Sequence, residues 1–199
     1  MGWAWDKKVG RYRDQETGRF LPVDQVRKWA NESIAASEDA ASQLAKMAAD
    51  GSLRASEINT TFRESIKGEY IRQYLVGIGG EGRMTQADWG SIGGMLKEQY
   101  GHLDDFVKEI AAGNLTEAQI RVRMDMYINS AREAYERAQL KVAKNTDKKE
   151  ESWMLGQSEH CDDCLAYADE GWQPLGHFPS PGAGKTVCLT NCQCHKEYR

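Results

Sequence analysis

Five cysteines, all between residues 161 and 194 of this 199-residue chain, are the residues whose types and spacing suggest chemistry most directly. Cys161 and Cys164 form a C-x-x-C knuckle, a spacing that can bring two thiolates onto one tetrahedral ion. Cys188, Cys192 and Cys194 follow after 23 intervening residues. Because zinc prefers four nitrogen or sulfur ligands at about 2.0–2.3 Å, the cluster predicts a structural zinc site.

The cysteines supply more candidate ligands than one ion needs. We expect Cys161 and Cys164 to be two of the ligands. The other two are expected to be Cys188 together with either Cys192 or Cys194. Three histidines stand in reserve: His160, His177 and His195. Adjacent residues do not readily bind one ion together, which argues against a cysteine used with its directly neighbouring histidine.

Three other states of the thiols stay open: free and buried, joined in disulfides, or redox-active. The odd number of cysteines and the absence of a secretion signal favour a metal site over a disulfide framework. A redox-active C-x-x-C usually begins a helix in a βαβ unit, and the sequence around Cys161 has no such unit.

Two glycine-rich stretches resemble nucleotide-binding loops. Residues 182–186, GAGKT, look like the end of a Walker A loop, but the first glycine of that motif would fall at Pro179. Residues 77–82, GIGGEG, match a dinucleotide fingerprint, but they follow a predicted helix where the fingerprint requires a strand. We interpret both stretches as turns or loops.

No group of residues predicts a hydrolase convincingly. Asp162 and Asp163 lie beside the cluster, but consecutive carboxylates seldom converge on one substrate. The triad-like run 158–160, Ser-Glu-His, lacks the Gly-x-Ser-x-Gly elbow. We therefore do not expect an enzyme. A metal-dependent hydrolase is the weaker alternative, with Asp163 or Glu159 as the base.

Apolar residues at helical spacing predict the elements that precede the cluster. The pattern predicts helices over 23–50, 53–77 and 116–144, the last one begun by a capping box of Thr116 and Gln119. Residues 86–112 contain four glycines, so we expect either two shorter helices or one with close approaches at its small residues. The predicted fold class is mainly α, with long amphipathic helices followed by a small, loop-rich cysteine-cluster module.

The same pattern divides the chain into four parts. Residues 1–22 are predicted to be an extended aromatic and basic arm, residues 23–144 a helical domain, and residues 145–152 a charged linker. Residues 153–199 form a cysteine-rich module that is too small to be held by an apolar core alone, so a stabilising metal is expected there.

Charge and hydropathy limit the classes of partner. The formal net charge is −4, and residues 153–199 carry more acidic than basic side chains, which does not favour nucleic-acid binding. No apolar stretch approaches the roughly 20 residues that a membrane-spanning helix needs. The N-terminus MGWAWD fits neither a signal peptide nor a myristoylation motif. We expect a soluble protein made in the cytoplasm.

The C-terminal segment EHCDDCLAYADEGWQPLG…PSPGAGKTVCLTNCQCHKEYR resembles the C-terminal module of tailed-phage minor head proteins, the Mu-F-like head morphogenesis family. Members typically combine a C-x-x-C, a proline-rich turn, a Cys-x-Cys and a short aromatic and basic tail. The helical region from residue 66 and the phrase GRYRDQETGRF are similar in character to phage virion proteins. Many relatives have a histidine shortly before the Cys-x-Cys, where this chain has Cys188, and cysteine can replace histidine on zinc.

The resemblance implies a structural or assembly protein of a virion, made in the host cytoplasm. It would lie in the head or near the portal and would act through contacts with the portal protein, the major capsid protein or copies of itself, without a membrane. The alternative is a zinc module that contacts packaged nucleic acid, which the acidic balance of residues 153–199 does not favour.

Overall fold

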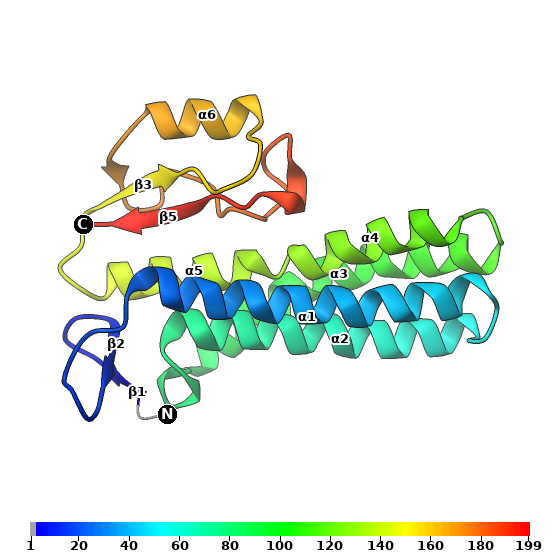
Figure 1. Cartoon of the computed structure of the whole chain (residues 1–199), viewed down its shortest axis with the longest axis horizontal. Coiled ribbons are helices and arrows are strands. Elements are labelled where there is room, and N and C mark those ends of the chain that lie inside the picture. Colours follow the sequence, from blue (N-terminus) through cyan, green and yellow to red (C-terminus); the bar gives the residue numbers. More distant parts are fainter. Residues whose placement is uncertain (1–2) are drawn as a thin grey trace.

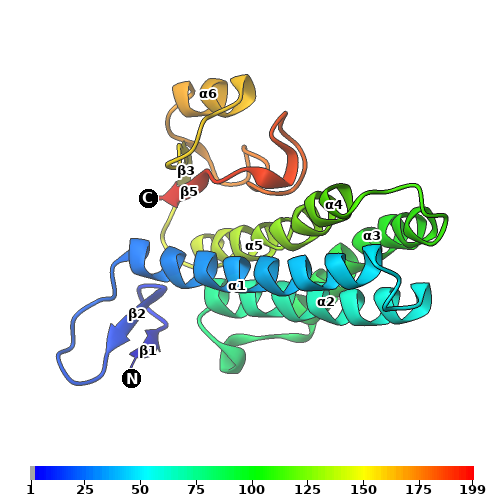
Figure 2. The same cartoon turned by 45° about the vertical axis from the view of Figure 1, so that its right-hand side comes forward.

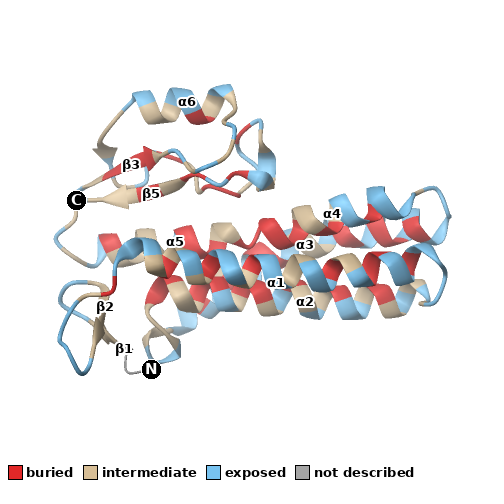
Figure 3. Cartoon of the chain, viewed as in Figure 1, coloured by how far each residue is buried: buried red, intermediate tan, exposed pale blue. Residues whose placement is uncertain are grey.

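The computed structural model describes residues 3–199, so Met1 and Gly2 of the expected arm lie outside the described residues. The predicted fold class is confirmed: long helices are followed by a small cysteine-rich module (Figure 1). The bundle consists of α1 (Val23–Ala49), α2 (Ala55–Ile78), α3 (Gln86–Ala111), α4 (Glu117–Asn129) and α5 (Arg132–Lys144). The helices α1, α2, α3 and the α4–α5 pair run side by side, and their buried residues face one another (Figure 3).

The start of α4 matches the sequence pattern. The backbone N–H of Thr116 donates to Gln119 Oε1 at 2.9 Å, and the N–H of Gln119 donates to Thr116 Oγ1 at 3.3 Å. This reciprocal box satisfies two N–H groups that a helix start leaves without partners. The start of α3 is similar, because the N–H of Thr85 donates to Asp88 Oδ2 at 2.8 Å.

Helix α3 is continuous, although its four glycines weaken it locally. A methyl group added at Gly90, Gly93, Gly94 or Gly101 would meet no atom within 4 Å, so the expected close approaches at these residues are wrong. The opposite face of α3 supplies the packing, with side chains such as Leu103 and Phe106 fully buried in the bundle core. Burial of that apolar face offsets the low helix propensity of the exposed glycines.

The single helix expected over 116–144 is divided between α4 and α5 at Ser130 and Ala131. The Ser130 hydroxyl donates to Tyr127 O at 2.6 Å and is hydrogen-bonded to Tyr70 OH at 2.8 Å. The N–H of Ala131 donates to Ile128 O, three residues back, at 3.1 Å. The Ser130 hydroxyl competes for a backbone carbonyl, and the hydrogen bond of Ala131 spans three residues in place of four. Together they interrupt the regular α-helical hydrogen bonds at this point.

The N-terminal segment forms a hairpin on the bundle, which differs from the expected extended arm. Strands β1 (Trp3–Asp6) and β2 (Arg11–Asp14) pair antiparallel beside the start of α1 (Figure 2). The ring of Trp5 lies over Gly79, the C-cap of α2, where φ is +94° and an added methyl would stand 2.1 Å from the ring. The GIGGEG stretch is therefore the end of α2 and a following turn that includes η1 (Glu81–Arg83), as we interpreted it.

The cysteine-rich module contains regular structure that sequence periodicity did not indicate. Strand β3 (Glu150–Met154) lies between β4 (Gln173–Pro174) and β5 (His195–Tyr198) in an antiparallel sheet. Two short helices complete the module, α6 (Asp162–Asp169) and η2 (Leu189–Asn191). Because β3 begins at Glu150, the charged stretch 145–152 is only in part a linker.

The module lies against α1, α4 and α5 through a partly charged interface. The side chains of Glu151 and Lys196 are fully buried, with Lys196 Nζ 3.4 Å from Glu151 Oε2. Glu136 of α5 is also buried, and its Oε2 has no hydrogen-bond partner among the described residues. Pro181 and Gly182 are buried at the α4–α5 junction, so the loop that looked like a Walker A motif contacts helices of this chain.

Candidate metal centre

Three short segments bring the five cysteines together. Cys161 is the N-cap of α6, and Cys164 lies in its first turn, which places both thiols at the same end of that helix. Cys188 precedes η2, and Cys192 directly follows it. Cys194 stands immediately before β5. The pairing of β5 with β3 therefore holds the second group of cysteines beside α6.

Cys164 is the centre of the cluster. Its Sγ lies 3.6 Å from Cys161 Sγ and 3.7 Å from the Sγ atoms of both Cys188 and Cys192. In a tetrahedron of thiolates at about 2.3 Å from one ion, neighbouring sulfurs are separated by about 3.8 Å. The spacing of the thiols fits such an ion, so the cluster can hold a metal.

The structure joins Cys188 to the expected first pair. The sulfurs of Cys161, Cys164 and Cys188 lie within 4.8 Å of one another, and so do those of Cys164, Cys192 and Cys194. Cys164 belongs to both sets, so the structure brings all five thiols to one cluster, and the choice between Cys192 and Cys194 as a fourth ligand stays a prediction.

The three reserve histidines have different surroundings. His177 Nε2 is 2.7 Å from Glu170 Oε2, and His195 lines a cleft outside the cluster. His160 Nδ1 is 3.8 Å from Cys194 Sγ, which places only His160 of the three beside a thiol within the described residues.

The cysteine thiols shift one another's pKa values strongly. Burial and the neighbouring Cys161 thiol raise the pKa of Cys164, and the hydrogen bond with Cys194 together with burial raises the pKa of Cys192. The same contact with Cys192 lowers the pKa of Cys194 to about 5. Burial alone would raise the pKa of Cys161, but backbone N–H groups of Cys164 and Cys188 bring it below its ordinary value. A negative charge on one sulfur disfavours ionisation of the neighbouring thiol, and a bound cation would offset this repulsion.

Two residues next to the cluster position the Cys188 segment. The Thr186 hydroxyl lies 3.2 Å from Cys188 Sγ, and the N–H of Val187 donates to Asp163 Oδ2 at 2.8 Å. Asp163, which the sequence offered as a base, thus fixes the loop that carries Cys188, while Glu159 is exposed. The sequence did not assign Thr186 to the cluster, because this residue completed the GAGKT pattern.

Three of the five thiols are buried, while Cys161 and Cys188 are partly exposed. Cys164 and Cys192 are 1% and 2% exposed, and they pack with Trp153 and Phe178 in the module core. The rings of Trp153 and Phe178 are 6.2 Å apart at their centroids. A metal bound here would be surrounded by protein sulfur, an arrangement typical of structural ions.

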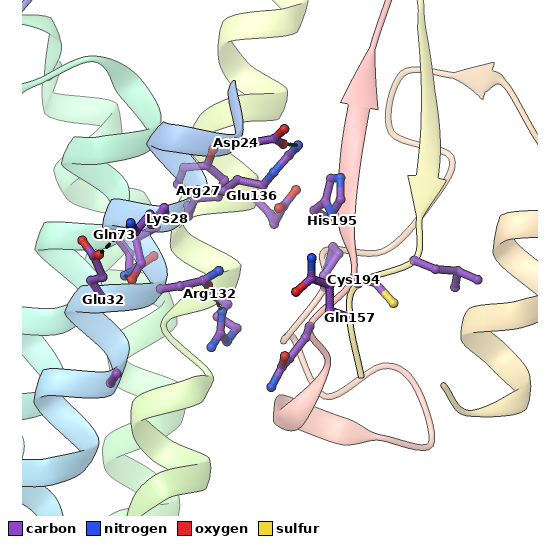
Figure 4. A pocket seen from close by; sticks show the side chains of 18 residues that line it. Asp24, Arg27, Lys28, Glu32, Gln73, Arg132, Glu136, Gln157, Cys194 and His195 are labelled. Carbon is purple, nitrogen blue, oxygen red and sulfur yellow. Dashed lines mark hydrogen bonds and ion pairs between the residues drawn. The ribbon is translucent and has the colours of Figure 1, made fainter. Parts of the chain in front are cut away.

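A cleft of about 770 Å³ lies beside the contact between the module and the bundle and is lined by residues of both. Figure 4 shows Arg27, Arg132 and Glu136 on the helical side, facing Gln157 and His195 of the module, while the sulfur of Cys194 points away from the cleft. Burial, and Arg27 nearby, lower the pKa of His195 to about 4. The sequence analysis missed this cleft because its walls come from segments far apart in the chain.

No family model, curated protein or solved structure matches the chain. Among residues 3–199, no helix is both long enough and apolar enough to cross a membrane.

Proposed function

We propose that the chain is a structural assembly protein of a tailed-phage virion, a minor head protein located near the portal or the capsid interior. In this proposal a zinc ion holds the C-terminal module together, and the protein acts through contacts with other proteins. The resemblance of residues 159–199 to the Mu-F-like head morphogenesis family supports this role.

The observation that carries the proposal is the cluster of five thiols. Two sets of three sulfurs share Cys164, one with Cys161 and Cys188 and one with Cys192 and Cys194, and the sulfurs of each set lie within 4.8 Å of one another. In this proposal Cys161, Cys164 and Cys188, with Cys192 or Cys194, bind the zinc. Thiolates at tetrahedral spacing select zinc over the harder divalent ions. When bound, the ion supplies folding free energy to a module whose apolar core is small.

Exposed apolar side chains near the cluster fit a role in protein contacts. Leu165, Val187 and Leu189 are 44%, 72% and 46% exposed and flank Cys164 and Cys188 in the sequence. A metal-clamped module would hold such side chains in fixed positions, ready to pack on a partner. The proposed partners are the portal protein, the major capsid protein or further copies of this chain.

Mass spectrometry of purified phage particles from the strain that encodes the chain tests this role. The proposal predicts peptides of the chain in intact, nuclease-treated heads, at a constant ratio to the portal protein. Its complete absence from heads at every stage of assembly, with the protein present in the lysate, would overturn the proposal.

A further inference from the structure

Arg132 occupies an unusual position in the cleft between bundle and module. It is the first residue of α5, directly after the break at Ser130 and Ala131. Its Nε donates to Asn129 Oδ1 at 3.2 Å, and its Nη1 donates to Asn31 Oδ1. Two amide oxygens from different helices therefore hold the guanidinium in one orientation.

This guanidinium has no carboxylate of its own. Among residues 3–199, no carboxylate oxygen forms an ion pair with Arg132 within 4.0 Å, and Nη2 has no hydrogen-bond acceptor. Glu38 is separated from it by Asn129, whose Nδ2 donates to Glu38 Oε1 at 2.6 Å. Burial lowers the pKa of Arg132, although the negative charges of Glu38, Glu69 and Glu136 act in the opposite direction.

The other cations that line the cleft already have partners. Arg27 Nη2 is 2.5 Å from Asp24 Oδ1, and Lys28 Nζ is 3.8 Å from Glu32 Oε1. Within the described part of the cleft, Arg132 is the one arginine or lysine without an ion pair. Among the described lining residues, Arg132 is thus the one arginine or lysine that is free to pair with an added anionic group.

The walls of the cleft favour a polypeptide as the source of that group. Gln157 and Gln193, both exposed, line the module side and can hydrogen-bond to a peptide backbone. A polynucleotide would bring a phosphate at every step toward Asp24, Glu32 and Glu136, which line the same cleft. A guanidinium held in a fixed plane matches the two oxygens of a carboxylate.

We infer that the cleft binds a segment of a partner polypeptide that carries a single aspartate or glutamate, whose carboxylate pairs with Arg132. This inference deepens the proposed assembly role and rests on it for the source of the partner. Asn31 and Asn129 are positioning residues, because they orient the guanidinium and do not themselves supply the charge.

The test is a titration of the zinc-loaded full chain, followed by NMR of the arginine Nε–H groups and of the backbone amides. The probe is acetyl-Ala-Glu-Ala-amide, and the matched control is acetyl-Ala-Gln-Ala-amide. We expect saturable shifts at Arg132 and at Gln157 and Gln193 with the glutamate peptide. The loss of one charge-assisted hydrogen bond should make the glutamine peptide bind about tenfold more weakly, or not measurably.

Amino-acid substitutions test whether Arg132 is the residue that binds the peptide carboxylate. Arg132→Gln should abolish the shifts, whereas Arg137→Gln, which alters an exposed arginine five residues further along α5, should leave them unchanged. If Arg132→Gln does not fold, Asn31→Ala serves in its place. It removes an exposed clamp on Nη1 and should weaken binding while the fold is kept.

Three outcomes would overturn the inference: equal shifts with both peptides, unchanged binding by Arg132→Gln or Asn31→Ala, or stronger binding of a short oligothymidylate at the same residues. Because the titration uses the isolated chain, its failure is separate from a failure to find the protein in phage particles.

Discussion

Gly182 lies directly against Arg132. A methyl group added at Gly182 would stand 2.9 Å from Arg132 Cβ and 3.4 Å from Asn129 O. The loop of the cysteine-rich module and the α4–α5 junction therefore approach so closely that only a hydrogen fits between them. This contact packs the module on the bundle, and the neighbouring Pro181 lines the same cleft as Arg132.

Replacing Gly182 by alanine should loosen the module from the bundle. We expect a loss of about 2–4 kcal/mol in the free energy of unfolding, from the left-handed backbone together with steric overlap. Gly184→Ala is the matched control, since Gly184 also has a positive φ, +68°, but nothing within 4 Å of an added methyl. Chemical denaturation of both variants measures the difference, and equal losses would show that the contact with Arg132 contributes nothing.

The corresponding pair in the N-terminal hairpin is Gly79→Ala and Gly80→Ala. Both glycines have a positive φ, but only at Gly79 would a methyl overlap the ring of Trp5. We expect Gly79→Ala to release the hairpin, with a red shift of tryptophan fluorescence and faster proteolysis before residue 20. If Gly80→Ala gives the same changes, backbone strain alone explains them and the packing of Trp5 does not.

Cys164→Ser should have the largest effect of any cysteine substitution, because its sulfur contacts three other thiols of the cluster. We expect loss of bound zinc and proteolysis within residues 150–199, while the helical circular dichroism of the bundle persists. Comparison of Cys192→Ser with Cys194→Ser identifies the fourth ligand, since one of the two should retain stoichiometric zinc. Retention of zinc by Cys164→Ser would contradict the assigned centre.

Glu136 should make stability depend on pH. Burial raises the pKa of Glu136 from 4.5 to about 7, although Lys196 and Arg27 act in the opposite direction and Glu151 adds to the rise. The folded protein therefore binds a proton that the unfolded chain releases between these values. The stabilisation that comes from the protonated Glu136 side chain is complete below about pH 4.5 and is lost as the pH rises to about 7.

The substitution Glu136→Gln should remove this dependence. Between about pH 5.5 and pH 8, the unfolding free energy of the wild type should fall relative to that of Glu136→Gln by on the order of 2 kcal/mol. Glu32→Gln, at the exposed mouth of the cleft, should follow the wild type. Parallel pH profiles for wild type and Glu136→Gln would show that the folded-state pKa of Glu136 is not raised.

Features that depend only on residues close together in the chain could be predicted from the sequence. Thr116 and Gln119 satisfy each other across one helical turn, so their spacing alone marks the start of α4. The C-x-x-C spacing of Cys161 and Cys164 likewise needs only the first turn of α6 to bring the two thiols together.

Features that depend on distant residues could not be predicted in this way. The helix break at Ser130 involves Tyr70, sixty residues earlier, and the hairpin is placed by Trp5 on Gly79. The stretch that contains Glu151 looked like a solvated linker because it is highly charged. Its buried partner Lys196 lies on β5, and only the sheet brings them together.

The most direct test of the central claim, a zinc ion that clamps the C-terminal module, is metal analysis of the purified full chain combined with limited proteolysis before and after chelation. The account predicts one zinc per chain. Chelation should then expose residues 150–199 to protease while residues 23–144 stay protected. A metal-free chain whose proteolytic pattern is the same with and without chelator would contradict it.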